Sequence, residues 1–190
     1  MDRTEAGKRR LLDAAATEFA AHGIAGARVD RISQQARVSK NQMYAYYGSK
    51  EGLFDAVLAD VVRGVVDQVP LDATDLPGYA VRLYDVYLTR PQIVRLSMWA
   101  RLEVTPDGPL FPADPAKVEA VQRAQKDGMV RTDIPAADVH ALVIALALTW
   151  SPTSLIHAAT AHDPRRDHDR RRTSLAAAVR GAVSLPGHSP

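Results

Sequence analysis

The side chains best suited to specific chemistry lie between residues 40 and 50. Lys40, Asn41 and Gln42 are followed by Tyr44 and, beyond a glycine, by Lys50. Asn and Gln amides can pair with both groups on the edge of adenine, Lys can reach guanine or a phosphate, and a Tyr hydroxyl can donate to a phosphate oxygen. This set of groups suits contact with a DNA duplex.

Two short helices, predicted at 29–36 and 40–47, must position these groups. Each has about two turns and buries too little surface to be stable alone, so the two must pack together and onto their neighbours. The spacing predicts a shared core of Ile32, Ala36, Val38, Met43 and Tyr47. The remaining side chains of the second helix then face outward, as in a helix-turn-helix motif. The alternative is an ordinary corner between two helices with a polar surface.

Charge and composition limit the possible functions. Residues 1–52 contain nine Lys or Arg and six Asp or Glu, a net charge of +3, whereas the rest of the chain has a net charge of −1. The N-terminal quarter is therefore the part that an anionic partner would favour. The chain has 190 residues, 46% of them hydrophobic, and no cysteine, which excludes disulfides, thiolate catalysis and cysteine zinc sites.

The whole chain is predicted to be all-α, because its apolar residues recur at helical spacing and no segment alternates with a period of two. Further helices are expected at 4–21, 50–68, 79–89, 92–104, 116–126, from Pro135 through 150, at 153–161 and at 167–183. Gly23 is expected to end the first helix in a left-handed turn, and Ser49 to cap the helix that follows it. No apolar stretch is long enough for a signal core or a membrane span, so a cytoplasmic location is expected.

Residues 36–53 resemble the signature of the TetR/AcrR family of transcriptional regulators. They read ARVSKNQMYAYYGSKEGL, and Phe19, Gly23 and the segment VDRIS at 29–33 match the family's first two helices. The resemblance implies an N-terminal three-helix DNA-binding domain at 1–50 and a C-terminal helical domain for effector binding and dimerisation at 51–190. It also implies a homodimer, usually a repressor, that leaves a palindromic operator when a small molecule binds.

The resemblance also implies which residues contact DNA. Tyr44 and Lys50 match the phosphate-contacting Tyr and Lys, and the recognition-helix positions are Lys40, Asn41, Gln42, Ala45 and Tyr46. Two positions depart from the family pattern. Arg28 replaces the Ser or Thr that commonly caps the second helix, and it could add a phosphate contact. Arg37 replaces the turn glycine, so the turn must either tolerate a side chain or change its angle.

Large side chains in the central region are candidates for lining an effector pocket. The predicted set is Tyr84, Tyr87, Met98, Trp99, Leu102 and Trp150, with Phe111 nearby. Such side chains favour a small apolar or aromatic effector, although each of them could equally fill a core. The proline-rich segment 105–115 could be a lid or a connector.

Two C-terminal segments, about 136–160 and 167–183, are predicted to form the interface with a second copy. The first is apolar on nearly all sides, and the second combines an apolar stripe with small alanines. The arginine-rich stretch 165–172 and the nearby His162, Asp163 and His168 are expected to be solvated. No metal or cofactor is expected, because His157 and His162 lie roughly 140° apart on a helix.

The sequence gives less support to two other classes of function. An enzyme is not favoured, because the sequence has no nucleophile elbow, no phosphate-binding glycine-rich loop and no paired histidine metal motif. The remaining alternative is a DNA-binding regulator without a small-molecule effector, whose C-terminal domain binds a protein partner.

Overall fold

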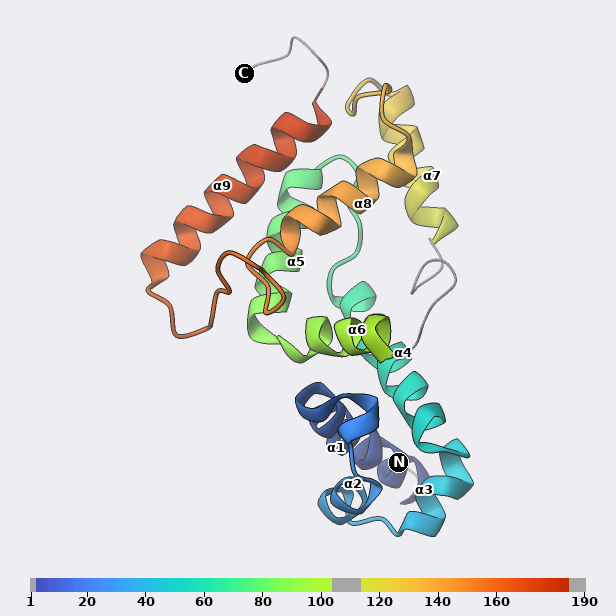
Figure 1. The fold of residues 1–190 in the computed structure, drawn as a ribbon. Helices are drawn as coiled ribbons and strands as arrows, with labels where there is room; N and C mark the ends of the chain where they lie inside the picture. Colours follow the sequence, from blue (N-terminus) through green and yellow to red (C-terminus); the bar gives the residue numbers. More distant parts are fainter. Residues whose placement is uncertain (1–2, 104–113, 185–190) are drawn as a thin grey trace. The chain divides into compact units, whose positions relative to one another are not determined.

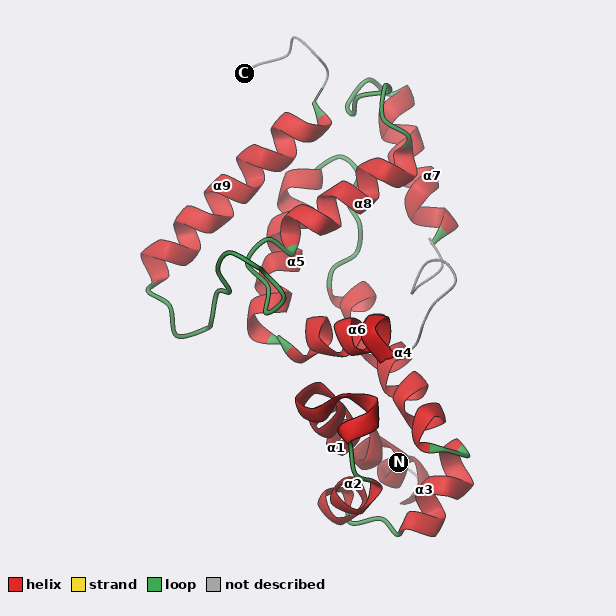
Figure 2. Ribbon diagram, viewed as in Figure 1, coloured by secondary structure: helices red, strands yellow, loops and turns green. Residues whose placement is uncertain are grey.

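The computed structural model describes residues 3–103 and 114–184, and its regular elements within these ranges are all α-helices (Figures 1 and 2). The all-α prediction is confirmed. The helices are α1 (Arg3–Gly26), α2 (Val29–Ala36), α3 (Lys40–Tyr47), α4 (Lys50–Gln68), α5 (Leu76–Thr89), α6 (Gln92–Glu103), α7 (Pro115–Lys126), α8 (Ala136–Ala147) and α9 (Arg165–Val183).

The chain divides into two compact units. Unit 1 comprises Met1–Val65 and Gln92–Leu110, and unit 2 comprises Val66–Pro91 and Phe111–Pro190. Unit 1 thus contains α1, α2, α3, most of α4 and all of α6. The helix α6 is separated from the others in sequence, but it packs against α1.

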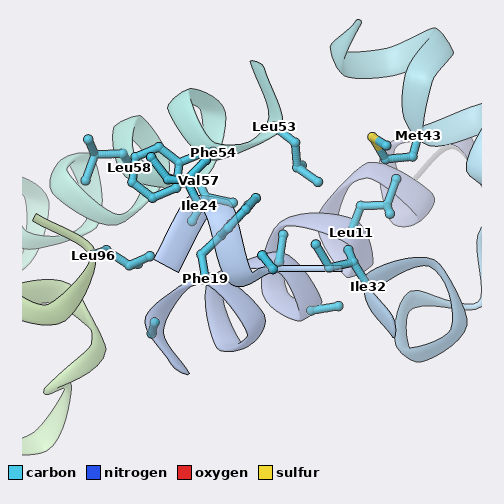
Figure 3. Packing of buried hydrophobic residues seen from close by; sticks show 14 of the residues in the cluster. Leu11, Phe19, Ile24, Ile32, Met43, Leu53, Phe54, Val57, Leu58 and Leu96 are labelled. Atoms are coloured by element: carbon cyan, nitrogen blue, oxygen red, sulfur yellow. The ribbon is translucent and has the colours of Figure 1, made fainter. Parts of the chain in front are cut away.

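The core of unit 1 fixes the position of α3 (Figure 3). Leu11, Ile32 and Met43 are fully buried where α1, α2 and α3 meet. Phe19 of α1 meets Phe54 of α4 edge to face, with ring centroids 5.2 Å apart. Because α2 and α3 are too short to be stable alone, this apolar contact with longer helices holds them in place.

The turn between α2 and α3 keeps its tight geometry without a glycine. Arg37 adopts φ 54° and ψ 45°, in the left-handed region. Its N–H donates to the carbonyl of Gln34, and the N–H of Val38 donates to that of Ser33, which is the Schellman pattern at a helix end. A non-glycine residue in this conformation costs roughly 1–2 kcal/mol. Of the two outcomes expected at Arg37, the structure shows that the turn tolerates a side chain without changing its angle.

Unit 2 is built around α5, which packs against both α8 and α9 (Figure 1). Leu175, Val179 and Val183 of α9 are buried, so the apolar stripe of this helix lies inside the unit. The segment after α7 is attached to the end of α9, because the N–H of Arg131 donates to the carbonyl of Val183 at 2.9 Å.

Several helix boundaries differ from the sequence predictions, and one predicted helix is absent. The helix α5 begins at Leu76, three residues earlier than predicted, because Asp75 caps it by accepting from the N–H of Gly78 and Pro77 suits a first turn. The predicted helix from Pro135 ends at Ala147 instead of 150, and the predicted helix 153–161 is absent. Pro152 has no N–H to continue the helix, and the loop instead closes through a bond from Ala159 N to Trp150 O.

The predictions for Phe111 as a pocket residue and for segment 105–115 as a lid or connector cannot be compared with the structure. Residues 104–113, which hold Phe111 and most of the proline-rich segment 105–115, lie outside the described residues. Among the described residues, no helix is long and apolar enough to cross a membrane.

Candidate nucleic-acid interface

One face of α3 is anchored in the core and the other is open to solvent. Met43 is fully buried, and the half-buried Tyr47 donates its hydroxyl to the carbonyl of Lys8 at 3.4 Å. The opposite face carries exposed Asn41, Gln42, Tyr44 and Ala45, with 47% of Tyr44 accessible. The orientation predicted for this helix is confirmed.

The start of α3 is fixed by a capping box between Ser39 and Gln42. The Ser39 hydroxyl accepts from the Gln42 N–H at 3.2 Å, and the Ser39 N–H donates to Gln42 Oε1 at the same distance. Sequence reasoning missed this cap, although Ser followed three residues later by Gln is its recognised signal. The cap holds the first turn of α3 in a single conformation.

The capping box also orients the amide of Gln42. A backbone N–H can only donate, so the side-chain atom facing Ser39 is the oxygen. The Gln42 NH₂ group is then the part that can meet a partner outside the protein. In this state Gln42 cannot make a bidentate contact with adenine, which needs its oxygen as an acceptor; it can donate to guanine O6 or N7 or to thymine O4.

Two of the predicted cationic contacts are engaged within unit 1. Lys40 forms an ion pair with Asp30 of α2 and remains about half exposed. Lys50 lies within 3.4 Å and 3.5 Å of the carbonyl oxygens of Ala25 and Ala27. Both ammonium groups therefore tie neighbouring elements together, and a phosphate would have to share or replace these partners.

Tyr46 has a packing contact as well as a place beside the exposed face. Its half-buried ring meets Tyr47 edge to face at 6.4 Å, and the Lys8 ammonium lies 5.7 Å from the centre of the Tyr46 ring. A hydrogen bond to Glu5 raises the pKa of Lys8 and so favours its charged form. These contacts attach the first turns of α1 to the last turn of α3.

The start of α2 is held by a carboxylate from α1 instead of a side-chain cap. Arg28 makes no side-chain capping bond, but its N–H donates to Glu18 Oε1 at 2.9 Å. The Arg31 guanidinium donates to the same oxygen at 2.6 Å. Burial opposes ionisation of Glu18, yet the bonds from Arg31 and Arg28 outweigh it and lower the pKa. Glu18 was not anticipated; its sequence signal is a carboxylate next to the core residue Phe19.

The end of α1 is shaped by its contact with α6. Gly23 interrupts the helix with φ 70° and ψ −175°, and the chain resumes helical geometry to Gly26, so it bends at Gly23 rather than ending there. A Cβ at Gly23 would lie 2.1 Å from Glu103 Oε1 and 2.9 Å from the Trp99 ring. The N–H of Ala25 donates to Glu103 Oε2 at 2.6 Å. Only glycine fits this conformation and this approach.

The six candidate pocket residues are divided between the two units. Met98, Trp99 and Leu102 belong to α6 in unit 1, where Met98 and Leu102 are exposed and Trp99 covers Gly23. Tyr84, Tyr87 and Trp150 belong to unit 2. The rings of Tyr84 and Trp150 meet edge to face at 6.0 Å. Burial raises the pKa of Tyr87 to about 12.

The start of α9 is solvated only in part: Arg165, Arg166, Arg170 and the nearby His162 are exposed as the sequence predicts, but His168 and Arg171 are buried. Arg171 is 4% exposed and His168 is 7% exposed. Asp163 accepts from Arg171 at 2.7 Å, and hydrogen bonds from Thr160 and Arg171 lower its pKa to about 2. The periodicity missed these residues because their charges are compensated by side chains from other elements. No group of three or more metal-ligating side chains occurs within residues 3–103 and 114–184.

Comparisons with known proteins agree with this geometry. Residues 11–57 match the family model "Bacterial regulatory proteins, tetR family", and residues 75–181 match "Tetracyclin repressor-like, C-terminal domain". The chain is 40% identical to the HTH-type transcriptional repressor SCO4008 of Streptomyces coelicolor over 152 residues, which cover 77% of this chain and 79% of that protein.

Two further relatives extend the comparison. The HTH-type transcriptional repressor NicS of Pseudomonas putida is 32% identical over 103 residues, which cover 50% of this chain and 47% of that protein. Among solved structures, that of SCO4942 from Streptomyces coelicolor has 40% sequence identity and a TM-score of 0.80, and the match covers 94% of this chain and 98% of that one.

Proposed function

The chain belongs to the TetR family of bacterial regulatory proteins, and on this premise we propose that it is a transcriptional repressor whose α3 helix enters the major groove of a palindromic operator. The observation that carries the proposal is the exposed row of Asn41, Gln42, Tyr44 and Ala45 on a helix that is anchored by Met43. That SCO4008 and NicS are named repressors supports the direction of control.

Residues in and beside α3 divide into two roles. Asn41 and Gln42 lie in its first turn, where recognition helices contact base edges. Tyr44, Lys50 and Arg28 serve as phosphate contacts, which fix the register on the duplex but carry no sequence information. Lys40, Ala45 and Tyr46 complete the surface. The ion pair of Lys40 with Asp30 places its ammonium close to a carboxylate, so its share in DNA affinity is the smaller one.

The protein acts as a homodimer through its C-terminal segments, about 136–160 and 167–183. Leu155 and Ile156 are 99% and 95% exposed, and Leu142 on α8 is 44% exposed. On α9, the small residues Ala177 and Ala178 face solvent. Large apolar side chains that are this exposed favour a partner surface. If the partner is a second copy of the same surface, the dimer has the two-fold symmetry of a palindromic operator.

A small apolar or aromatic effector binds in unit 2 and releases the operator. The support is an interior that mixes aromatic rings with polar tips, at Tyr84, Tyr87 and Trp150. The alternative, a regulator whose C-terminal domain binds a protein partner instead, draws on the same exposed Leu155 and Ile156. Sedimentation analysis tests whether these side chains pair with a second copy: a homodimer interface predicts dimers of the purified chain that dissociate in the Leu155→Ser, Ile156→Ser double variant but not in Met129→Ser.

The DNA proposal is tested by fluorescence anisotropy with a duplex from upstream of the coding sequence and a shuffled duplex of equal composition. Tyr44→Phe and Lys50→Ala should weaken binding to both duplexes alike. Lys50→Ala should also reduce the slope of log affinity against log salt by about one, whereas Tyr44→Phe, which removes a neutral hydroxyl, should leave the slope unchanged. Lys126→Ala, which removes one charge from unit 2, is the matched control. Equal affinity of the native chain for both duplexes at every salt concentration would contradict the proposal.

A further inference from the structure

A buried polar cluster in unit 2 has hydrogen-bonding capacity that its own residues do not use. Its buried side chains are Tyr84 of α5 and His168 and Arg171 of α9. Two side chains of the preceding loop complete it nearer the surface: Asp163, which is 20% exposed, and His157, which is 57% exposed. Arg171 Nε and His168 Nε2 are both buried and have no hydrogen-bond partner among the described residues. Their side chains are 96% and 93% buried, the complements of 4% and 7% exposure.

The hydrogen bonds already formed fix what the two free nitrogens can do. The Tyr84 hydroxyl lies 2.8 Å from His168 Nδ1. The Tyr84 hydroxyl also shares a hydrogen bond with Arg171, whose nitrogens can only donate, so the phenolic oxygen accepts from Arg171 and directs its own proton to His168 Nδ1. In neutral His168 the remaining proton is then on Nε2, which makes Nε2 a donor. Arg171 Nε also carries a proton, so both unpartnered groups are donors.

The charge of the cluster is already balanced. Arg171 donates through Nη1 to Asp163 at 2.7 Å, and its Nη2 lies 2.9 Å from His157 Nε2, which must act as the acceptor because an arginine nitrogen only donates. One buried cation is thus paired with one carboxylate. A second anion at this place would leave an uncompensated buried charge, which is more costly than a neutral acceptor.

We propose that the Tyr84, His168 and Arg171 cluster is the polar end of the effector site and that it binds the neutral carbonyl oxygen of a small aromatic or apolar molecule. The inference rests on the proposed function, whose effector it narrows to a chemical class. His168 and Arg171 lie one turn apart on α9 and both flank Tyr84, whose ring meets Trp150 at 6.0 Å. A carbonyl oxygen has two lone pairs and adds no charge, so it suits two buried donors beside an aromatic wall.

Three probes of similar size separate this class from its neighbours: acetophenone has a neutral carbonyl, benzoate a carboxylate and ethylbenzene no acceptor. The readout is the ¹⁵N-edited NMR signal of the Arg171 Nε–H in the full chain, assigned by its loss in Arg171→Lys. Acetophenone should shift this signal and the His168 nitrogen signals. Ethylbenzene should leave them in place, and benzoate should bind at least tenfold more weakly.

Two variants test the residues. His168→Asn keeps a polar atom toward Tyr84 but removes Nε2, so acetophenone affinity should fall about tenfold, the effect of one hydrogen bond between buried groups. Arg172→Lys changes the neighbouring arginine, which pairs with Asp85, and should leave affinity unchanged. Ethylbenzene binding as tightly as acetophenone, an Arg171 Nε–H signal that no probe moves, or unchanged acetophenone affinity in His168→Asn would overturn the inference.

Operator binding, measured by anisotropy on the same samples, distinguishes a failure of this inference from a failure of the proposed function. His168→Asn without a probe should bind the operator as the native chain does. Loss of operator selectivity in the native chain would defeat the proposed function. Acetophenone that shifts Arg171 Nε–H without releasing DNA would support the site while contradicting its role in release.

Discussion

Unit 1 and unit 2 treat their buried charges differently. In unit 1 the carboxylate of Glu18 accepts from Arg31 and from the backbone of Arg28. Among the described residues of this unit, the buried side-chain atom without a partner is the neutral hydroxyl of Ser33. In unit 2, Arg171 and His168 are buried as deeply, yet each keeps a nitrogen without a partner among the described residues. Unit 1 thus uses its buried charged groups to hold its helices, including α3, in place. Unit 2 keeps buried hydrogen-bond donors that have no partner among the described residues.

The largest stability effect is expected where unit 1 anchors α3. Met43→Ala removes a fully buried side chain and should lower the free energy of unfolding by about 3 kcal/mol, from lost burial and a residual cavity. Tyr44→Ala, one position further on the exposed face, is the control and should change stability little. Urea denaturation followed by tryptophan fluorescence and circular dichroism measures both. An equal loss of unfolding free energy in the two variants would contradict the role of Met43 as the residue that anchors α3 in the core.

The bend of α1 is the second point at which the rigidity of unit 1 can be broken. Gly23→Ala places a Cβ against Glu103 and Trp99 in a backbone region that favours glycine, and should cost about 2 kcal/mol. Gly26→Ala, whose Cβ would meet only His22 at 3.5 Å, is the matched control and should cost nothing measurable. Thermal unfolding of both variants measures the two stability changes. Equal stability of Gly23→Ala and Gly26→Ala would contradict the close contact between Gly23 and α6.

A smaller effect is expected at the capping box. Ser39→Ala loses the bond to the N–H of Gln42 and should cost about 1 kcal/mol, whereas Ser39→Asn keeps a capping oxygen and should cost less. Denaturant unfolding gives the stability difference. Hydrogen exchange of the α3 amides should rise in Ser39→Ala only, and equal exchange in the two variants would contradict the cap.

In unit 2 the ion pair of Asp163 with Arg171 should stabilise the fold in a pH-dependent way. The pKa of Asp163 is lowered to about 2, so its carboxylate stabilises the fold above the ordinary value of 3.8, and this stabilisation is lost as pH falls towards 2. The stability difference between the native chain and Asp163→Asn should therefore be constant above pH 3.8 and shrink below it. Chemical denaturation across this pH range measures the difference. A constant difference down to pH 2 would contradict the pairing with Arg171.

Sequence patterns were sufficient where local spacing decides the structure. The bounds of α2 and α3 follow from the periodicity of Ile32, Ala36 and Met43 and from the break at residues 37–39, although the Ser39 cap within this break was missed. The inward and outward faces of α3 follow from the same spacing. The sequence predicts an interruption at Pro152, but it did not show that the helix ends at Ala147 or that residues 153–161 form a loop. The backbone bond from Ala159 N to Trp150 O, which closes this loop, leaves no signal in the apolar pattern.

Tertiary partners decide the remainder, and a sequence does not show them. Lys50 reads as a free cation for phosphate, but the fold brings it to the carbonyls of Ala25 and Ala27. Arg171 reads as one of a solvated arginine run, but the fold buries it against Asp163 and His157. In each case the deciding contact joins residues from different elements, so helical periodicity carries no signal for it.

Whether α3 reads bases can be measured by selecting bound duplexes from a random pool with the native chain, Gln42→Ala and Lys126→Ala. In the proposed function the exposed face of α3 contacts base edges, and the cap leaves Gln42 with donor groups. The native chain should therefore select a palindrome, and Gln42→Ala should lose the preference for guanine or thymine at one position of each half-site while keeping the others. Lys126→Ala should select the native sequence. An identical selected sequence from Gln42→Ala, or none from the native chain, would contradict the claim.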